Sequence, residues 1–101
     1  MFEKSIDTQK GTLYYRIKED KVTITTYHGN DTQVIVPERI EDVPVRKIGK
    51  KAFLNSRQLR QVILPDTLKK LGEWAFAYCG LLEKVELPKR RVAIGKGCFL
   101  D

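Results

Sequence analysis

One motif occurs three times in this chain at a fixed spacing. Residues 48–53 read IGKKAF, and the related strings LGEWAF and IGKGCF occupy 71–76 and 94–99, each 23 residues after the last. Between them, LRQVILP at 59–65 returns 23 residues later as LEKVELP at 82–88. A fixed period in this range predicts a solenoid, in which one short unit stacks on the next. A solenoid coil presents a surface rather than an enclosed catalytic pocket.

The segment before the repeats has the pattern of a β-hairpin. Residues 13–17 and 22–27 are rich in aromatic and β-branched side chains, and a charged turn at 18–21 separates them. Residues 28–31 contain glycine, asparagine and aspartate, which predicts a second turn. A strand closed by proline follows at 33–37 and already matches the strands of the repeat. We therefore expect a hairpin that caps the first coil.

Each coil is expected to contain a strand, a proline corner, a glycine bend and a short helical turn. The apolar residues before the prolines have period two, which is typical of a strand with one buried face. The glycine of each IGxxAF unit is expected to permit a tight bend, and the alanine and phenylalanine after it to be buried from one helical turn. Equal phases predict aligned columns of Phe53, Phe76 and Phe99, of Ile48, Leu71 and Ile94, and of Leu59 and Leu82.

This combination of motifs resembles the BspA-type leucine-rich repeats of bacterial and some protozoan surface proteins. The strings at 59–64 and 82–87 fit the general L-x-x-L-x-L core, with proline in place of the usual asparagine or cysteine. The resemblance covers about residues 13–100. It implies a β-solenoid with strands on the concave face, a role in binding other proteins, often as an adhesin at the cell surface, and no catalytic residues.

The predicted fold class is α/β: a leucine-rich-repeat solenoid of about two and a half 23-residue coils, with short strands, short helical turns and an N-terminal β-hairpin cap. Residues 1–44 are assigned to the cap and the first repeat strand. Residues 45–101 are assigned to the BspA-type repeats, truncated at the C-terminus. The first unit carries a five-residue insertion around 39–44, which we expect to form a surface loop.

Charge is unevenly distributed along the chain. Residues 1–44 hold 6 Lys and Arg against 8 Asp and Glu, a net −2, whereas residues 45–101 hold 13 against 5, a net +8. The basic half is either a solvated outer face or a surface that attracts nucleic acid, acidic lipid or an acidic protein. The apolar runs are too short to span a membrane. The N-terminus has no signal peptide, which predicts a cytoplasmic protein if the chain is complete and a cell-surface protein if it is a fragment.

No catalytic, cofactor or metal site is predicted. His28 lies in a predicted turn without companions at a ligand spacing. The glycines recur once per coil and are structural rather than part of a phosphate-binding loop. Cys79 and Cys98 occupy different phases of the repeat, so no disulfide is implied. Cys98 is expected to be buried, and Cys79, next to a glycine turn, partly accessible.

The strands of the repeat also predict an outward row of side chains. If the residues before each proline alternate inward and outward, two outward isoleucines lie side by side and are candidate anchors for a partner. The alternative is that the row only supports pairing within the sheet. Its members are Gln33, Ile35, Gln61, Ile63, Lys84 and Glu86.

A second row is basic, and stacked like charges repel one another, so it indicates a solvated edge or an acidic partner. Its candidate members are Arg46, Lys47, Lys69 and Lys70, which share phases, and Lys89, Arg90 and Arg91 after the next proline. Trp74 lies at the phase of Lys51 and Gly97, outside the core. It is expected to be half-exposed, as an interface residue or packed on the Lys51 stem.

The function predicted from these features is a non-enzymatic protein–protein interaction module of a bacterial adhesin-like repeat protein. One alternative is a binder of nucleic acid or another acidic polymer through the basic half. Another is a structural spacer or cap. No polar cap appears after the third unit, which predicts either that the chain is the N-terminal portion of a longer array or that the last coil is covered by a second copy through self-association.

Overall fold

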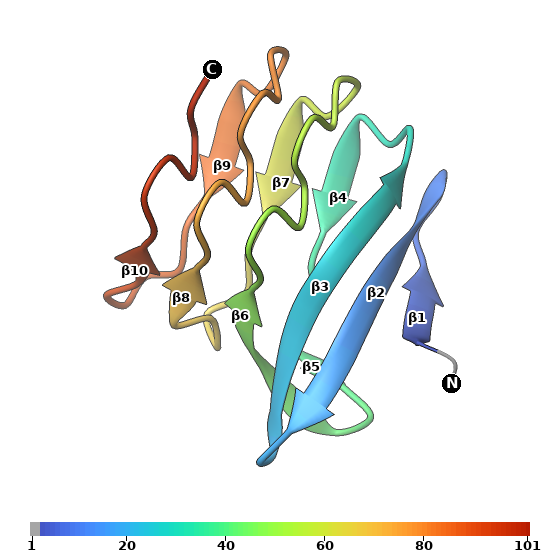
Figure 1. Cartoon of the computed structure of the whole chain (residues 1–101). Coiled ribbons are helices and arrows are strands. Elements are labelled where there is room, and N and C mark those ends of the chain that lie inside the picture. Colours follow the sequence, from blue (N-terminus) through green and yellow to red (C-terminus); the bar gives the residue numbers. More distant parts are fainter. Residues whose placement is uncertain (1–2) are drawn as a thin grey trace.

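The computed structural model describes residues 3–101 as two β-sheets wound from one chain (Figure 1). Residues 3–101 contain no helix, so the α/β class and the short helical turns predicted from the sequence are wrong. The strands are β1 (Lys4–Asp7), β2 (Gly11–Lys18), β3 (Lys21–Gly29), β4 (Gln33–Ile35), β5 (Arg39–Ile40), β6 (Val43–Ile48), β7 (Gln61–Ile63), β8 (Lys70–Leu71), β9 (Lys84–Glu86) and β10 (Ala93–Ile94).

Each turn of the solenoid adds one strand to each sheet. The smaller sheet has the order β4-β7-β9, and the larger sheet the order β1-β2-β3-β6-β8-β10, with β5 paired to β6. Ile48, Leu71 and Ile94 are parallel partners in register, as the phases predicted. The third turn contains both β9 and β10, so the array has three turns rather than two and a half.

A run of turns follows the larger-sheet strand in each coil, at residues 50–55 in the first coil and 73–78 in the second, and we call it the limb of turns. In these two coils it hydrogen-bonds to the next coil. The backbone amides of Lys51, Phe53 and Asn55 donate to carbonyl oxygens of the following coil at 2.7–2.9 Å. The amides between them donate to the carbonyl three residues earlier. Lys51 and Asn55 have φ of 60° and 61°, a left-handed conformation that a right-handed helix excludes. Every second backbone amide in this segment therefore bonds to the next coil instead of within its own coil, and no helix forms.

Three aromatic rings stack along the axis, and the structure adds a fourth. The ring centroids of Phe53 and Phe76 lie 4.8 Å apart, and those of Phe76 and Phe99 lie 5.6 Å apart. The predicted column is therefore confirmed. Tyr27 of β3 extends it, with its ring 5.0 Å from that of Phe53. The hairpin thus covers the first coil with a ring of its own.

The N-terminal hairpin is confirmed and continues the larger sheet. Strands β2 and β3 pair through a turn in which Glu19 and Asp20 have φ of 54° and 59°, as a two-residue hairpin turn requires. β3 then runs parallel to β6. β3 reaches Gly29, so His28 lies in a strand and not in the predicted turn.

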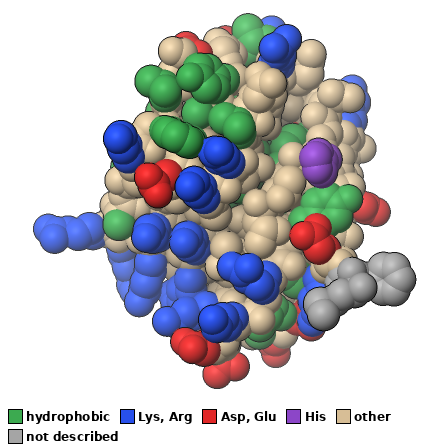
Figure 2. Space-filling view, viewed as in Figure 1, with side chains coloured by type: hydrophobic (Ala, Val, Ile, Leu, Met, Phe, Trp, Pro, Cys, Tyr) green, Lys and Arg blue, Asp and Glu red, His purple; other side chains and the backbone are tan. Residues whose placement is uncertain are grey.

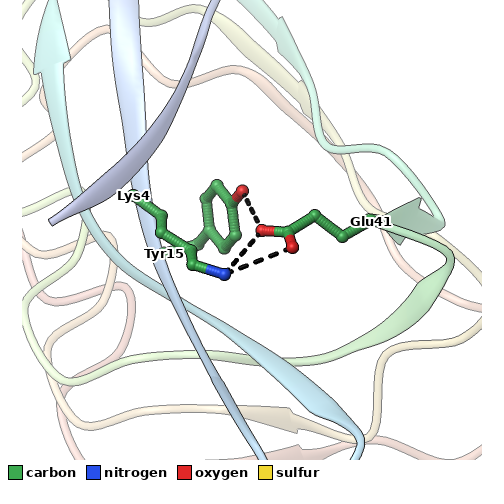
Figure 3. Close-up of polar contacts among 3 residues, drawn as sticks. All are labelled: Lys4, Tyr15 and Glu41. Carbon is green, nitrogen blue, oxygen red and sulfur yellow. Dashed lines mark hydrogen bonds and ion pairs between the residues drawn. The ribbon is translucent and has the colours of Figure 1, made fainter.

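The insertion in the first unit is a second small hairpin rather than a loop. β5 pairs with β6 across a turn at Glu41 and Asp42, which also have positive φ. Figure 3 shows how this turn is joined to the N-terminal strands: Glu41 Oε2 accepts hydrogen bonds from Tyr15 Oη at 2.7 Å and Lys4 Nζ at 3.0 Å. The hydrogen bond from Tyr15, followed by that from Lys4, lowers the pKa of Glu41. Both ionic side chains are about half exposed, so the pair adds little stability.

Asp31 joins the hairpin to the first coil and is 3% exposed. Its carboxylate accepts hydrogen bonds from Thr8 Oγ1, from the Lys10 amide at 2.8 Å and from Tyr27 Oη at 2.7 Å. Burial alone would raise the pKa of Asp31, but these hydrogen bonds outweigh it and hold the pKa below its ordinary value. A buried charge that is fully hydrogen-bonded fixes one orientation of the cap.

The repeat glycines are needed for close approach between coils rather than for a bend. A Cβ on Gly72 would lie 2.7 Å from the Gly49 carbonyl carbon and 2.7 Å from the Lys50 amide nitrogen. A Cβ on Gly95 would meet backbone of the second coil at 2.7 Å. Neither glycine has positive φ, so neither adopts a backbone conformation that only glycine favours. Only Gly97 has positive φ among the glycines of residues 3–101.

Candidate interaction surfaces

The outward row of the β4-β7-β9 sheet forms a continuous strip. Gln33, Gln61 and Lys84 are register partners, and Ile35, Ile63 and Glu86 are the next set. Gln33 Nε2 donates to Gln61 Oε1 at 3.2 Å. Ile35 is 62% exposed, Ile63 is half-buried beside it, and Lys84 and Glu86 are exposed. The residues lie where the sequence predicted, and their role in binding stays a prediction.

A shallow groove of about 400 Å³ lies where these strands meet the proline corners. Most of the residues that line it are apolar, and Ile35, Ile63 and Leu87 are among them. Leu87 occupies the position of the buried Leu64 one coil later, but it is 45% exposed because no further coil packs on the third turn within residues 3–101. The groove also has an acidic rim, made by Glu38, Asp66 and Glu86 with one cation, Lys89.

Sequence reasoning missed this acidic rim, although a signal for it exists. Glu38 directly follows Pro37, and Asp66 directly follows Pro65. The two carboxylates therefore share a phase and lie at corresponding corners of neighbouring coils. In the third coil the same position is Lys89, whose backbone amide donates to Asp66 Oδ1 at 3.1 Å.

The predicted basic row is assembled on another side of the coils. Lys47 of β6 and Lys70 of β8 are register partners, and the Lys69 amide donates to the Arg46 carbonyl at 2.8 Å. Figure 2 shows Lys and Arg side chains gathered over the left and lower part of this view, the side of β6, β8 and β10.

The loop after Pro88 adds its cations to this row. Arg90 and Arg91 line a groove of about 380 Å³ together with Arg46 and Lys69. An adjoining depression of about 370 Å³ is lined by Lys89 as well. The sequence placed these residues near one another, and the structure brings them to one surface, while the use of that surface stays a prediction.

Trp74 is half-buried and packs within the molecule. The Lys51 ammonium lies 5.1 Å from the centre of its ring. A Cβ at Gly97 would lie 2.1 Å from two atoms of the indole, so the ring covers this glycine. Trp74 has φ of 55°, at the phase where the next coil carries Gly97. The ring is thus fixed between neighbouring coils, and its role as an interface residue stays a prediction.

The two thiols are buried and unpaired. Cys98 is 2% exposed, as expected, whereas Cys79 is 7% exposed, so its predicted accessibility is wrong. The Cys79 thiol donates to the Phe53 carbonyl at 3.1 Å. Burial raises the pKa of both thiols, which disfavours the reactive thiolate.

The exposed His28 imidazole packs edge-on against Tyr14, with 5.8 Å between ring centroids. Across residues 3–101, no group of three or more His, Cys, Asp and Glu is placed to hold a metal ion. The same residues include no helix long and apolar enough to cross a bilayer.

Stacked coils, rows of exposed side chains and shallow grooves define a β-solenoid repeat protein. The model of the family "BspA type Leucine rich repeat region (6 copies)" matches residues 27–101, and the chain belongs to this family. The match begins at Tyr27, the first ring of the column. The comparison with curated proteins finds no match.

Solved structures of bacterial leucine-rich repeat proteins are similar to this chain. A protein from Bacteroides capillosus is 29% identical over 91% of this chain and 71% of its own, with a TM-score of 0.76. The Treponema pallidum Leucine Rich Repeat protein is 33% identical over 75% of this chain, with a TM-score of 0.73. A Bacteroides ovatus protein is 25% identical over 82% of this chain, with a TM-score of 0.66. The chain spans 36% of the T. pallidum protein and 23% of the B. ovatus protein.

Proposed function

We propose that this chain is a non-enzymatic protein-interaction module that binds a partner protein through the outward face of the β4-β7-β9 sheet. The observation that carries the proposal is the pair Ile35 and Ile63, which are register neighbours on that face, Ile35 being 62% exposed. An apolar pair with one exposed member, rimmed by polar side chains, is suited to contact with another protein.

The groove beside this pair indicates what a partner would offer. Its apolar wall suits an aliphatic or aromatic side chain. Its rim of Glu38, Asp66 and Glu86 suits a lysine or arginine next to that side chain. The adhesin-like role at a cell surface that the family resemblance implies stays a prediction.

Peptide display tests the proposal without a known partner. A random peptide library is selected on the immobilised chain, and the selected peptides are measured by fluorescence anisotropy against Ile35→Ser and Ile63→Ser. Each substitution is expected to weaken binding by about tenfold or more, since burying an isoleucine contributes roughly 1.5–3 kcal/mol. Selected peptides should carry an apolar residue beside a basic one.

Leu54→Ser is the matched control, because Leu54 is an exposed apolar residue (38%) on the limb of turns, outside this sheet. Its peptide affinities should equal those of the wild type. The proposal fails if the selected peptides bind Ile35→Ser and Ile63→Ser as tightly as the wild type while circular dichroism shows all variants folded.

A further inference from the structure

The geometry points to a second binding surface, separate from the sheet face, on the side of β6, β8 and β10. We propose that it binds an acidic peptide segment of a partner protein, in which an apolar side chain is flanked by carboxylates. We call this surface the cationic groove. Its rim is Arg46, Lys69, Arg90 and Arg91, and its floor is Leu68, Val92 and Ala93.

The charges of the cationic groove are not neutralised within the molecule. The two ion pairs among residues 3–101 are Lys4–Glu41 and Arg60–Glu83, and neither involves the rim. Asp66 is the only acidic residue that lines the groove, and one of its oxygens accepts the Lys89 amide. The concentration of unpaired cations supplies a field that attracts an anionic ligand.

Neighbouring Lys47 and Lys70 increase this field. They are register partners on adjacent parallel strands, which lie about 4.8 Å apart. Like charges directly opposite each other destabilise a sheet. Neither lysine lines the groove, so the two charges act on an anionic ligand through their field and not through direct contact.

Two hydrogen bonds hold the rim in place before any ligand arrives. Arg46 is half-buried, and its Nη1 donates to the Thr67 carbonyl at 3.0 Å. A guanidinium has five N–H donors, and this bond is the only one that the Arg46 side chain donates among residues 3–101. The bond from the Lys89 amide to Asp66 positions the loop that carries Arg90 and Arg91. Preorganised donors reduce the entropy lost on binding.

The floor favours a peptide over other polyanions. Leu68 is buried, Val92 is half-buried and Ala93 is exposed, so the bottom of the groove accepts an apolar side chain. None of the residues that line the groove is aromatic, whereas single-stranded nucleic acid binds by stacking its bases on aromatic rings. A sulfated polysaccharide carries the charge but no apolar side chain. An acidic peptide supplies both.

The test uses a synthetic fluorescein-labelled peptide with a central leucine flanked on both sides by glutamates. Anisotropy at low salt is expected to show binding that the Arg90→Gln/Arg91→Gln double variant weakens about tenfold, or about 1.4 kcal/mol. The same peptide with serine in place of leucine should also bind more weakly, because it leaves the floor empty. Binding should weaken as salt is raised.

A matched control separates the groove from general attraction to a basic protein. Arg57→Gln/Lys96→Gln removes two exposed cations that do not line the groove and lowers the net charge equally. It should leave the affinity within about twofold. Equal losses in the two double variants overturn the proposal. So does tighter binding of heparin or single-stranded DNA than of the peptide, with the same dependence on Arg90 and Arg91.

Discussion

Replacing Gly72 with alanine tests whether the repeat glycine is required for neighbouring coils to pack closely. A Cβ at this position would lie 2.7 Å from the Gly49 carbonyl carbon, 2.7 Å from the Lys50 nitrogen and 3.0 Å from the Ile48 oxygen. All three are backbone atoms of the preceding coil and cannot rotate away. The Gly72 amide is also bonded to the Ile48 carbonyl at 2.7 Å. The added methyl group therefore has to push the two coils apart.

The size of the effect follows from two opposing contributions. Forcing an extra methyl group into a packed site costs about 1–3 kcal/mol. Alanine also restricts the unfolded chain, which stabilises the folded state by about 0.4–1 kcal/mol where the backbone permits it. We expect Gly72→Ala to lower the free energy of unfolding by about 1–2 kcal/mol. For a chain of this size, that lowers the midpoint of thermal unfolding by about 4–16 °C.

Two other glycines serve as graded controls, followed by circular dichroism during heating. At Gly80 the nearest atom to a new Cβ is the Asp101 carboxylate at 3.9 Å, so Gly80→Ala should leave the midpoint unchanged or raise it. At Gly49 the closest contact is 3.0 Å, to the Ile24 oxygen, which predicts a smaller loss than at Gly72. The reasoning is refuted if Gly72→Ala and Gly80→Ala shift the midpoint equally.

The remaining predictions concern the aromatic column and the pH dependence of folding. Phe76→Ala should lower the free energy of unfolding, measured in urea, by about 3–5 kcal/mol. Phe99→Ala should lower it by less than half of that, because Phe76 is 1% and Phe99 is 40% exposed. Similar losses for the two variants would contradict a column that is buried at its centre. Burial and the hydrogen bond to Asp31 raise the pKa of Tyr27 from 10.0 to about 12. The stability from its neutral phenol is therefore complete below pH 10 and is lost as the pH rises through 12, by up to about 3 kcal/mol. Urea titrations from pH 9 to 12 should show this loss in the wild type and a smaller one in Tyr27→Phe, and equal slopes would count against it. The lowered pKa of Asp31 contributes stability above its ordinary value of 3.8 that disappears as the pH falls through the folded-state value. Asp31→Asn should therefore reduce the acid dependence of the unfolding free energy, and an unchanged acid limb would show that another carboxylate dominates.

Part of the candidate site was predictable because the repeat period fixes which residues are neighbours. The match of Gln33, Gln61 and Lys84 in register follows from the phase of the strands alone. The same logic placed Lys47 beside Lys70. It did not find the ring of Tyr27, which lies 26 rather than 23 residues before Phe53, because β3 covers the first coil as a continuous strand without the corners of a repeat unit.

Other features depend on how far apart the coils lie. The sequence predicted that Gly72 and Gly95 permit bends. Their role in the close approach of neighbouring coils follows only from the distance to the preceding coil. Cys79 was predicted to be accessible because it lies beside a glycine, but it is buried and its thiol donates a hydrogen bond to the Phe53 carbonyl, 26 positions away. Neither local conformational preference nor phase contains these distances.

The repeat period alone establishes that this chain is a stack of 23-residue coils, because only stacking lets so short a unit bury its recurring apolar positions. The conformation of the limb of turns that contains Lys51 and Asn55 depends instead on the packing of neighbouring coils. Its amides can bond within a coil, as in a helix, or between coils, as in a ladder, and local sequence is compatible with both. The next coil supplies the carbonyl oxygens for bonds between coils. Lys51 and Asn55 adopt the left-handed conformation, which interrupts the helical alternative.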